Sequence, residues 1–317
     1  MAKDVLSQPH FHDEEAARVW FEAARWDNKP VCPHCQSVKY YNTKKVGRYR
    51  CAAQTCRKDF TVMTGSVMER SHVKLTLWAK AFYLTASSKK GFSAHQLHRA
   101  LGCEYNTAWF LHHRVMEAMR RGGLDISTLG GEGKFVEADE TYYGPVKEPR
   151  TRTKQGKPYK SSATGRGGQG PANKRIIVSL VERGGEVRSF HVPFATKELV
   201  MNIVRNSVDR ESSLFSDESH LYHGADRHFA DHSTVNHGRK EYVRGKVSTN
   251  TIEGFFGIFK RGMRGVYQHC SEKNLHRYLA EFDYRYSTRH MSDEERTALA
   301  IKGGEGKRLT YHQSAEA

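Results

Sequence analysis

The sequence has no long hydrophobic run. No apolar stretch of roughly 18 residues, the length that a membrane-spanning helix needs, occurs anywhere in its 317 residues. The start, MAKDVLSQPHFHDEEAARVW, is polar and acidic, unlike the apolar core of an export signal. Both absences favour a cytoplasmic protein.

Acidic residues are also in deficit. Asp and Glu number 35 against 51 Lys and Arg, so the formal net charge is +16. A protein this basic usually binds a polyanion, with nucleic acid as the first candidate and an anionic membrane surface as the second. Since no apolar segment supports the membrane, we expect nucleic acid to be the partner.

Cysteine is sparse, and four of the six cysteines fall in two close pairs. Cys32 and Cys35 form a C-x-x-C pair, and Cys51 and Cys56 follow a basic, aromatic segment with four residues between them. In a reducing compartment, clustered cysteines indicate a metal rather than disulfides. Two such pairs about fifteen residues apart are typical of a zinc ribbon. We therefore favour Zn²⁺ over disulfides or free thiols, with His34 as a bystander.

Helical patterns flank this segment. Residues 13–26 have the apolar stripe of an amphipathic helix, which Asp13 can cap. Residues 71–121 also have a helical pattern. Within the second stretch, Ser93 can cap one helix and Gly102 can supply the turn to another. This pattern predicts a helix-turn-helix whose second helix lies in a major groove, and a helical hairpin without DNA contact is the alternative.

Strands and helices alternate after a glycine-rich linker, which predicts an α/β domain. It contains a basic, glycine-rich insertion at 145–174, which either follows a phosphate backbone or only aids solubility. The chain after Gly303 is expected to be disordered. The predicted domains are an N-terminal helix (1–27), the zinc ribbon (28–68), the helix-turn-helix region (69–122), a linker (123–133), the α/β domain (134–290) and a tail (291–317).

Two aspartates of the α/β domain stand at the ends of apolar strands. Asp139 follows FVEA and Asp217 ends SLFSD. Open α/β sheets bind their ligands at such strand ends, and two carboxylates there can hold Mg²⁺. A later helix carries Asn250 and Glu253 one turn apart, with Lys260 seven positions beyond Glu253 on the same face. We expect this helix to supply the third metal ligand.

Nearby residues have more than one interpretation. Glu137 shares a strand face with Asp139, so it is either an auxiliary ligand or an ion-pair partner. His237 can approach the site, but an ordinary partly buried histidine is the simpler interpretation. The phenylalanines at positions 255, 256 and 259 are expected in the core rather than against a DNA base.

Several segments together resemble the bacterial insertion-sequence transposases of the ISXO type, the fifteen-ninety-five family. They are VEADETYYG, SDESHLYHG and STNTIEGFFGIFKRGMRGVYQHCSEKNLHRYLAEFDYRYSTR, with CPHC, RYRC and KDFTVMTGSVMERSHVKLTLWAKAFYLTASSKKGFSAHQLHRALGCEYNTAW upstream. The resemblance covers most of residues 15–290. It implies a zinc-binding N-terminal region, a helix-turn-helix and an RNase-H-like mixed sheet with flanking helices, of the class whose active site is two aspartates and a third acid.

By this resemblance Asp139 is the first catalytic aspartate and Asp217 the second. The family's motif often has Asn and Lys in place of the third acid, which points to Asn250 and Lys260. Glu253, in contrast, keeps the acid-to-cation spacing of the wider class. We favour Glu253 as a charged Mg²⁺ ligand or base on chemical grounds, with Asn250 able to coordinate through its carbonyl oxygen and Lys260 contacting a phosphate.

The expected function is therefore DNA transposition. Mg²⁺ or Mn²⁺ would support strand cleavage at the element ends and strand transfer into target DNA. The expected partners are double-stranded terminal inverted repeats and target DNA, bound by a homo-oligomer associated with the nucleoid. The alternatives are an RNase-H-like nuclease or resolvase without strand transfer, and a DNA-binding regulator without enzymatic activity.

Overall fold

The computed structural model describes residues 4–121, 127–146, 173–235 and 243–310. The chain forms two compact units, which are described separately. The N-terminal unit comprises residues 1–123 together with 280–317, and the sheet unit comprises residues 124–279. Within the described residues, no helix combines the length and apolar character needed to cross a bilayer.

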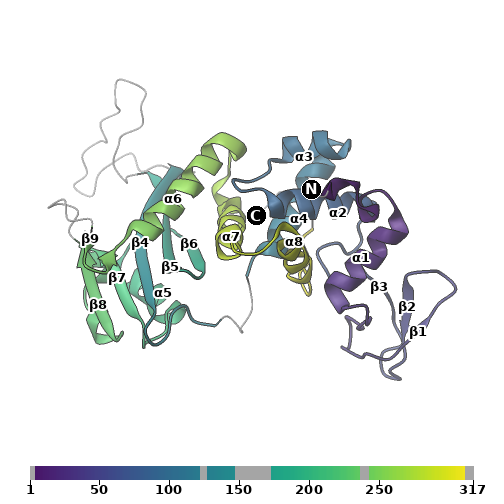
Figure 1. The fold of residues 1–317 in the computed structure, drawn as a ribbon, viewed down its shortest axis with the longest axis horizontal. Helices are drawn as coiled ribbons and strands as arrows, with labels where there is room; N and C mark the ends of the chain where they lie inside the picture. The colour runs from purple at the N-terminus through teal and green to yellow at the C-terminus, as the bar shows by residue number, and fades with distance from the viewer. Residues whose placement is uncertain (1–3, 122–126, 147–172, 236–242, 311–317) are drawn as a thin grey trace. The chain divides into compact units, whose positions relative to one another are not determined.

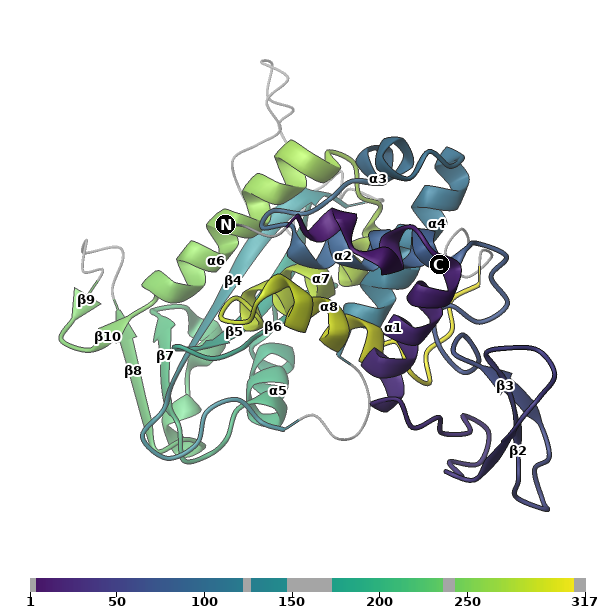
Figure 2. The same cartoon turned by 45° about the vertical axis from the view of Figure 1, so that its right-hand side comes forward.

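Helices form most of the N-terminal unit (Figures 1 and 2). Asp13 caps the first long helix through a 2.8 Å hydrogen bond from the Ala16 N–H, and Ser93 and Gln96 form a reciprocal capping box, as their sequences predict. Gly102 ends the helix that Ser93 begins, and its φ of 62° is the left-handed conformation that glycine adopts freely. The elements are η1 (Val5–Ser7), η2 (Pro9–Phe11), α1 (Glu14–Trp26), α2 (Leu75–Ser87), α3 (Ala94–Leu101), α4 (Tyr105–Met119) and α8 (Asp293–Lys302).

Helix α4, the predicted groove-binding helix, is largely a core element. Leu111, Val115 and Ala118 belong to the apolar core of the N-terminal unit, together with Trp78 and Phe82 of α2. The first turn of α4 is exposed. A groove contact by this helix would therefore use that turn rather than its whole length.

The chain from Gly304 to Thr310 is ordered, contrary to the expectation of disorder for the segment after Gly303. As far as Thr310 it is described, and it packs on the N-terminal unit: Gly304 accepts a backbone hydrogen bond from Val67, and Leu309 is 4% exposed. The buried Arg114 donates to the Leu309 carbonyl at 3.1 Å. One apolar side chain and a few backbone acceptors thus fix a segment that has no strong sequence pattern.

The zinc-ribbon segment is a three-stranded antiparallel sheet in the order β1 (Tyr40–Asn42), β2 (Arg48–Cys51) and β3 (Asp59–Thr61). Its apolar side packs against the last turn of α1. The rings of Trp26 and Phe60 meet edge to face at 5.9 Å, and Tyr49 donates a 2.9 Å hydrogen bond to Glu22.

The sheet unit contains five strands in the order β6-β5-β4-β7-β8. The first three are antiparallel, whereas β7 and β8 run parallel to β4. This mixed sheet has the order expected of an RNase-H-like core. The strands are β4 (Phe135–Pro145), β5 (Lys174–Glu182), β6 (Val187–Val192), β7 (Ser213–Asp217) and β8 (Asp231–Val235).

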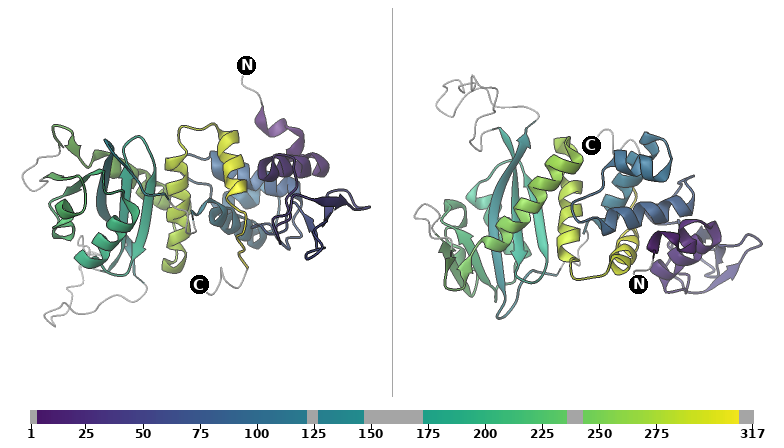
Figure 3. Two further views of the ribbon diagram at one scale, coloured as in Figure 1. Left: turned by 90° about the horizontal axis from the view of Figure 1, so that it is seen from below. Right: turned by 45° about the horizontal axis from the view of Figure 1, so that its top comes forward.

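Helices cover the two faces of this sheet. Val136 and Ala138 of β4 form a core with Val200 and Val204 of α5 (Lys197–Ser207). The opposite face, to which Glu137, Asp139 and Tyr143 point by alternation, carries α6 (Asn250–Gly262), as Figures 1 and 3 show. Tyr143 meets Phe259 of α6 edge to face at 5.3 Å.

Shorter elements complete the sheet unit. The chain enters α6 from the hairpin of β9 (Val243–Arg244) and β10 (Val247–Ser248), and leaves it through a π-helical turn at Met263–Tyr267. Helix α7 (Leu275–Ser287) contains the boundary between the two units, inside the domain that we predicted to extend to residue 290. The remaining turns are η3 (His220–Tyr222), η4 (Ala225–Arg227) and η7 (Glu272–Asn274).

Candidate active site and metal centres

Four thiols converge at one end of the ribbon. The Sγ atoms of Cys32, Cys35, Cys51 and Cys56 all lie within 4.8 Å of one another, with Cys32–Cys56 at 3.8 Å and Cys35–Cys51 at 3.5 Å. Tetrahedral zinc with Zn–S bonds of about 2.3 Å requires sulfur atoms about 3.8 Å apart. The donor set therefore fits zinc, and the ribbon matches the prediction.

The wider second cysteine pair closes because its extra residues form a turn. The N–H groups of Cys56 and Arg57 both bond to the Ala53 carbonyl, and Arg57 adopts a left-handed φ of 50°. Burial raises the pKa of Cys32, and hydrogen bonds from the backbone N–H groups of His34 and Cys35 to its sulfur act in the opposite direction. The His34 side chain is not among the clustered donors, in agreement with its prediction as a bystander.

A second cluster lies in the sheet unit where β7 ends beside the middle of β4. Asp217 ends β7 as predicted, but Asp139 does not end its strand, because β4 continues to Pro145 in pairing with β5. Because β4 and β7 are parallel neighbours, with Glu137 paired to Phe215, Asp139 and Asp217 follow level with each other. The carboxylates of Asp139, Glu140 and Asp217 lie within 4.8 Å of one another. The structure therefore brings together the two aspartates that the sequence singled out.

The third member of this cluster, Glu140, was not predicted as a ligand. Its neighbour Asp139 faces α6, so simple alternation assigns Glu140 to the α5 side. There it accepts hydrogen bonds from Tyr222 at 3.1 Å and Ser219 at 3.4 Å, which direct the carboxylate toward Asp217. The adjacent acids in ADET and the tyrosine shortly after Asp217 were the available signals.

Helix α6 presents the remaining candidates. Glu253 lies outside the 4.8 Å group, but its charge is close enough to raise the pKa of Asp139. Burial and then the charge of Arg264 lower the pKa of Lys260, while Asp139 opposes them. Glu253 and Lys260 are thus both electrostatic neighbours of Asp139, as their seven-residue spacing predicts. Asn250 is exposed in the first turn of the helix.

The carboxylate cluster is strained electrostatically without a cation. Burial, then the charges of Asp217 and Glu140, raises the pKa of Asp139 to about 8. Burial and Asp217 also raise the pKa of Glu140. A divalent cation would relieve this repulsion, and carboxylate oxygens are the ligands that Mg²⁺ prefers. The donor set therefore fits a magnesium ion.

We predict that the stability of the Mg²⁺-free protein falls as the pH rises from about 4 to about 8. Because the pKa of Asp139 is higher in the folded state than in the unfolded chain, the folded state holds the extra proton throughout this window. The free energy of unfolding should decrease by at most about 1.4 kcal/mol per pH unit. Thermal unfolding with zinc left bound measures it.

Asp139→Asn should make the free energy of unfolding depend less steeply on pH over this window. In the unaltered protein, Mg²⁺ should raise the free energy of unfolding most strongly near pH 8. Glu132→Gln, which removes an exposed carboxylate of the same unit, serves as the control and should leave the slope unchanged. An equally steep slope in Asp139→Asn would contradict the assignment of the pH dependence to this residue.

Glu137 is not part of the carboxylate cluster. It is fully buried, and Arg183 forms an ion pair with it at 2.7 Å, so the ion-pair interpretation of this residue describes its observed contacts. Phe255, Phe256 and Phe259 are buried, as expected. His237 and most of the predicted basic insertion lie outside the described residues.

Comparisons with known proteins match both the ribbon segment and the sheet unit. The model for the ISXO2-like transposase domain matches residues 128–287, and the model for a transposase zinc-ribbon domain matches residues 12–59. An uncharacterized protein in transposable element ISH50 of Halobacterium salinarum is 29% identical over 283 residues, which is 87% of this chain and 91% of that protein. The first match covers half of the chain and includes Asp139 and Asp217, and the chain therefore belongs to the ISXO2-like transposases, with a transposase zinc ribbon ahead of the sheet unit.

Proposed function

We propose that this transposase cleaves DNA strands at the ends of its element and transfers the freed 3′ ends into target DNA, in a reaction that depends on Mg²⁺ or Mn²⁺. The observation that carries the proposal is the convergence of Asp139, Glu140 and Asp217 where β7 ends beside β4. A cluster of acids with raised pKa values, beside a helix that carries cations, suits a metal-dependent phosphodiester reaction.

Asp139 and Asp217 would hold the metal, with Glu140 beside them and Glu253 or Asn250 completing the set. Bound there, a divalent cation activates the attacking hydroxyl and stabilises the leaving oxygen. The chain's own task is to place these groups in line. Glu253 can accept a proton from the attacking water or 3′-hydroxyl, and Lys260 can pair with a phosphate oxygen near the cut.

In each step one P–O bond forms as another breaks, so no covalent enzyme intermediate is needed. In cleavage, water attacks the phosphorus and the 3′ oxygen of the element leaves with a proton. In transfer, that 3′-hydroxyl attacks a target phosphodiester and displaces the target's own 3′ oxygen. The same set of groups serves both steps.

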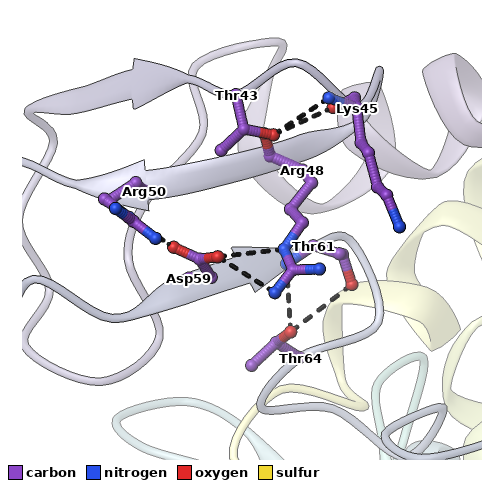
Figure 4. Close-up of polar contacts among 7 residues, drawn as sticks. All are labelled: Thr43, Lys45, Arg48, Arg50, Asp59, Thr61 and Thr64. Carbon is purple, nitrogen blue, oxygen red and sulfur yellow. Dashed lines mark hydrogen bonds and ion pairs between the residues drawn. The ribbon is translucent and has the colours of Figure 1, made fainter.

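The zinc ribbon is the proposed site of element-end binding. On one face of β2 and β3, Asp59 accepts hydrogen bonds from Arg48 at 3.0 Å and Arg50 at 2.7 Å, as Figure 4 shows. Both arginine side chains are about half exposed, so the carboxylate orients two cations at the surface. Cations oriented in this way suit the phosphates of a DNA backbone.

The experiment that tests the function uses a labelled donor DNA that ends in the element's terminal repeat, together with target DNA and Mg²⁺. We expect both a cleaved donor strand and a product in which the donor 3′ end is joined to target DNA. Cleavage without joining would instead indicate a nuclease or resolvase. End binding with neither product, in Mg²⁺ and in Mn²⁺, would indicate a DNA-binding regulator.

A further inference from the structure

The first turn of α6 is capped by a side chain of strand β4 and not by its own N-cap residue. Thr249, at the N-cap position, makes no side-chain hydrogen bond to the helix's first N–H groups. Instead, the Ile252 N–H donates to Glu137 Oε2 at 2.9 Å, and the Thr251 hydroxyl donates to Glu137 Oε1 at 2.9 Å. A carboxylate at a helix N-terminus is favoured by the helix dipole as well as by these bonds. Glu137 of β4 therefore fixes the start of this helix on the sheet.

Arg183, one residue beyond β5, contacts both Glu137 and the hairpin that leads into α6. Its Nε donates to Glu137 Oε1 at 2.7 Å, and its Nη1 donates to the Lys246 carbonyl at 2.6 Å. Its Nη2 donates to the carbonyl and the hydroxyl of Ser248, at 3.0 and 2.7 Å. The guanidinium lies 4.9 Å from the centre of the Phe215 ring. One arginine thus joins β4 and β5 to the hairpin that leads into α6.

These contacts connect directly to the candidate active site. Glu137 precedes Asp139 by two residues on the same face of β4, and Ile252 immediately precedes Glu253. We infer that Glu137 and Arg183 are a positioning pair that sets the first turn of α6 and so holds Glu253 toward Asp139. The inference rests on the proposed function in treating Glu253 as part of the metal site.

Glu137 is unsuited to be a metal ligand itself. One of its oxygens accepts two hydrogen bonds and the other accepts one, and the side chain is 0% exposed. Removing its charge would leave Arg183 with an unpaired charge and the first turn of α6 without its acceptor. The expected consequence is a displaced Glu253 and weaker metal binding, because groups that orient metal ligands contribute to metal affinity.

A double-mutant cycle in the full-length protein tests this inference. The readout is the Mg²⁺ concentration that gives half of the maximal thermal stabilisation, with zinc left bound, so it does not depend on cleavage or strand transfer. Glu137→Gln and Glu253→Gln should each raise this concentration about tenfold, and the double variant should raise it no further than either single variant. Binding to element ends should stay unchanged.

Glu182→Gln is the matched control. Glu182 lies on β5, away from α6. It forms an ion pair with Lys134 at 2.9 Å and accepts a hydrogen bond from the Gly130 N–H at 2.9 Å, so its substitution removes a comparable set of contacts. Its variant should bind Mg²⁺ like the unaltered protein. If Glu137→Gln does not fold, Arg183→Lys replaces it as the test. Lysine keeps the positive charge but cannot make all the hydrogen bonds of the guanidinium, so we expect a smaller increase in the half-maximal Mg²⁺ concentration.

Two outcomes would overturn the inference. One is an unchanged Mg²⁺ dependence in Glu137→Gln or Arg183→Lys, with only a lower unfolding temperature, which would show a purely structural role. The other is a double variant whose increase equals the product of the two single effects, which would show that Glu137 does not act through Glu253. Failure of the strand-transfer assay alone would count against the proposed function and not against the positioning pair.

Discussion

Replacing Asp217 by asparagine should abolish strand cleavage while leaving binding to the element ends intact. The substitution removes the charge of one of the three clustered carboxylates, and it nearly keeps the volume of the side chain. A loss of at least about a thousandfold in the cleavage rate, roughly 4 kcal/mol in the barrier, is expected from losing a metal ligand. Asp139→Asn should behave in the same way. The measurements are cleavage of a labelled donor strand and a gel-shift of the same DNA.

Asp226→Asn is the control for this experiment. Asp226 is an exposed carboxylate in η4 of the same unit and is not part of the acidic cluster. Its variant should cleave at the normal rate, which separates the effect of the site from a general change of charge. Cleavage by Asp217→Asn at a rate within tenfold of the unaltered protein would exclude this residue as a required metal ligand. Loss of end binding together with cleavage would point to misfolding instead.

Asp217 ends β7 as its sequence pattern predicts, whereas β4 continues to Pro145, so Asp139 lies inside its strand and not at the predicted end. The two aspartates still meet, because the parallel register of β4 and β7 places Asp139 level with Asp217. The helix caps Asp13 and Ser93 were predictable because a cap involves residues within one turn.

Glu140 and the attachment of α6 could not be predicted in this way, because their partners are distant in the sequence. Glu140 reaches the cluster through a hydrogen bond from Tyr222, whose position depends on the turn after β7. The orientation of α6 depends on Glu137, Arg183 and Ile252, which belong to three separate parts of the chain. This is also why spacing alone leaves the choice between Asn250 and Glu253 open.

The extent to which α4 is buried and the packing of residues 304–310 could not be predicted for a related reason. A helix-turn-helix and a core hairpin share the same local signals, namely a cap, a glycine turn and an apolar stripe. Whether the second helix is exposed depends on what covers it, and α2, α3 and α8 all pack on α4. Likewise, only the tertiary contacts of Val67 and Arg114 fix the residues after Gly303.

Replacing Cys51 by serine should remove the zinc ion, unfold the ribbon and abolish specific binding to element ends. Strands of three or four residues cannot hold a sheet by themselves, and two of the buried side chains of this segment, Cys32 and Cys51, are proposed zinc ligands. Zinc binding contributes about 10–16 kcal/mol in small zinc-dependent folds, so most of the ribbon's stability would be lost. A chromogenic zinc assay and a gel-shift with terminal-repeat DNA measure the two effects.

Cys103→Ser is the matched control, since Cys103 is half-buried in the same unit but outside the thiol cluster. It should keep one zinc per chain and bind DNA normally. The Mg²⁺-induced stabilisation of the sheet unit should survive in Cys51→Ser, because the acidic cluster belongs to a separate compact unit. A Cys51→Ser protein that still held one zinc and bound element ends with unchanged affinity would contradict a four-thiolate site. If zinc were lost but specific end binding were kept, recognition would have to lie elsewhere, with the exposed first turn of α4 as the nearest candidate.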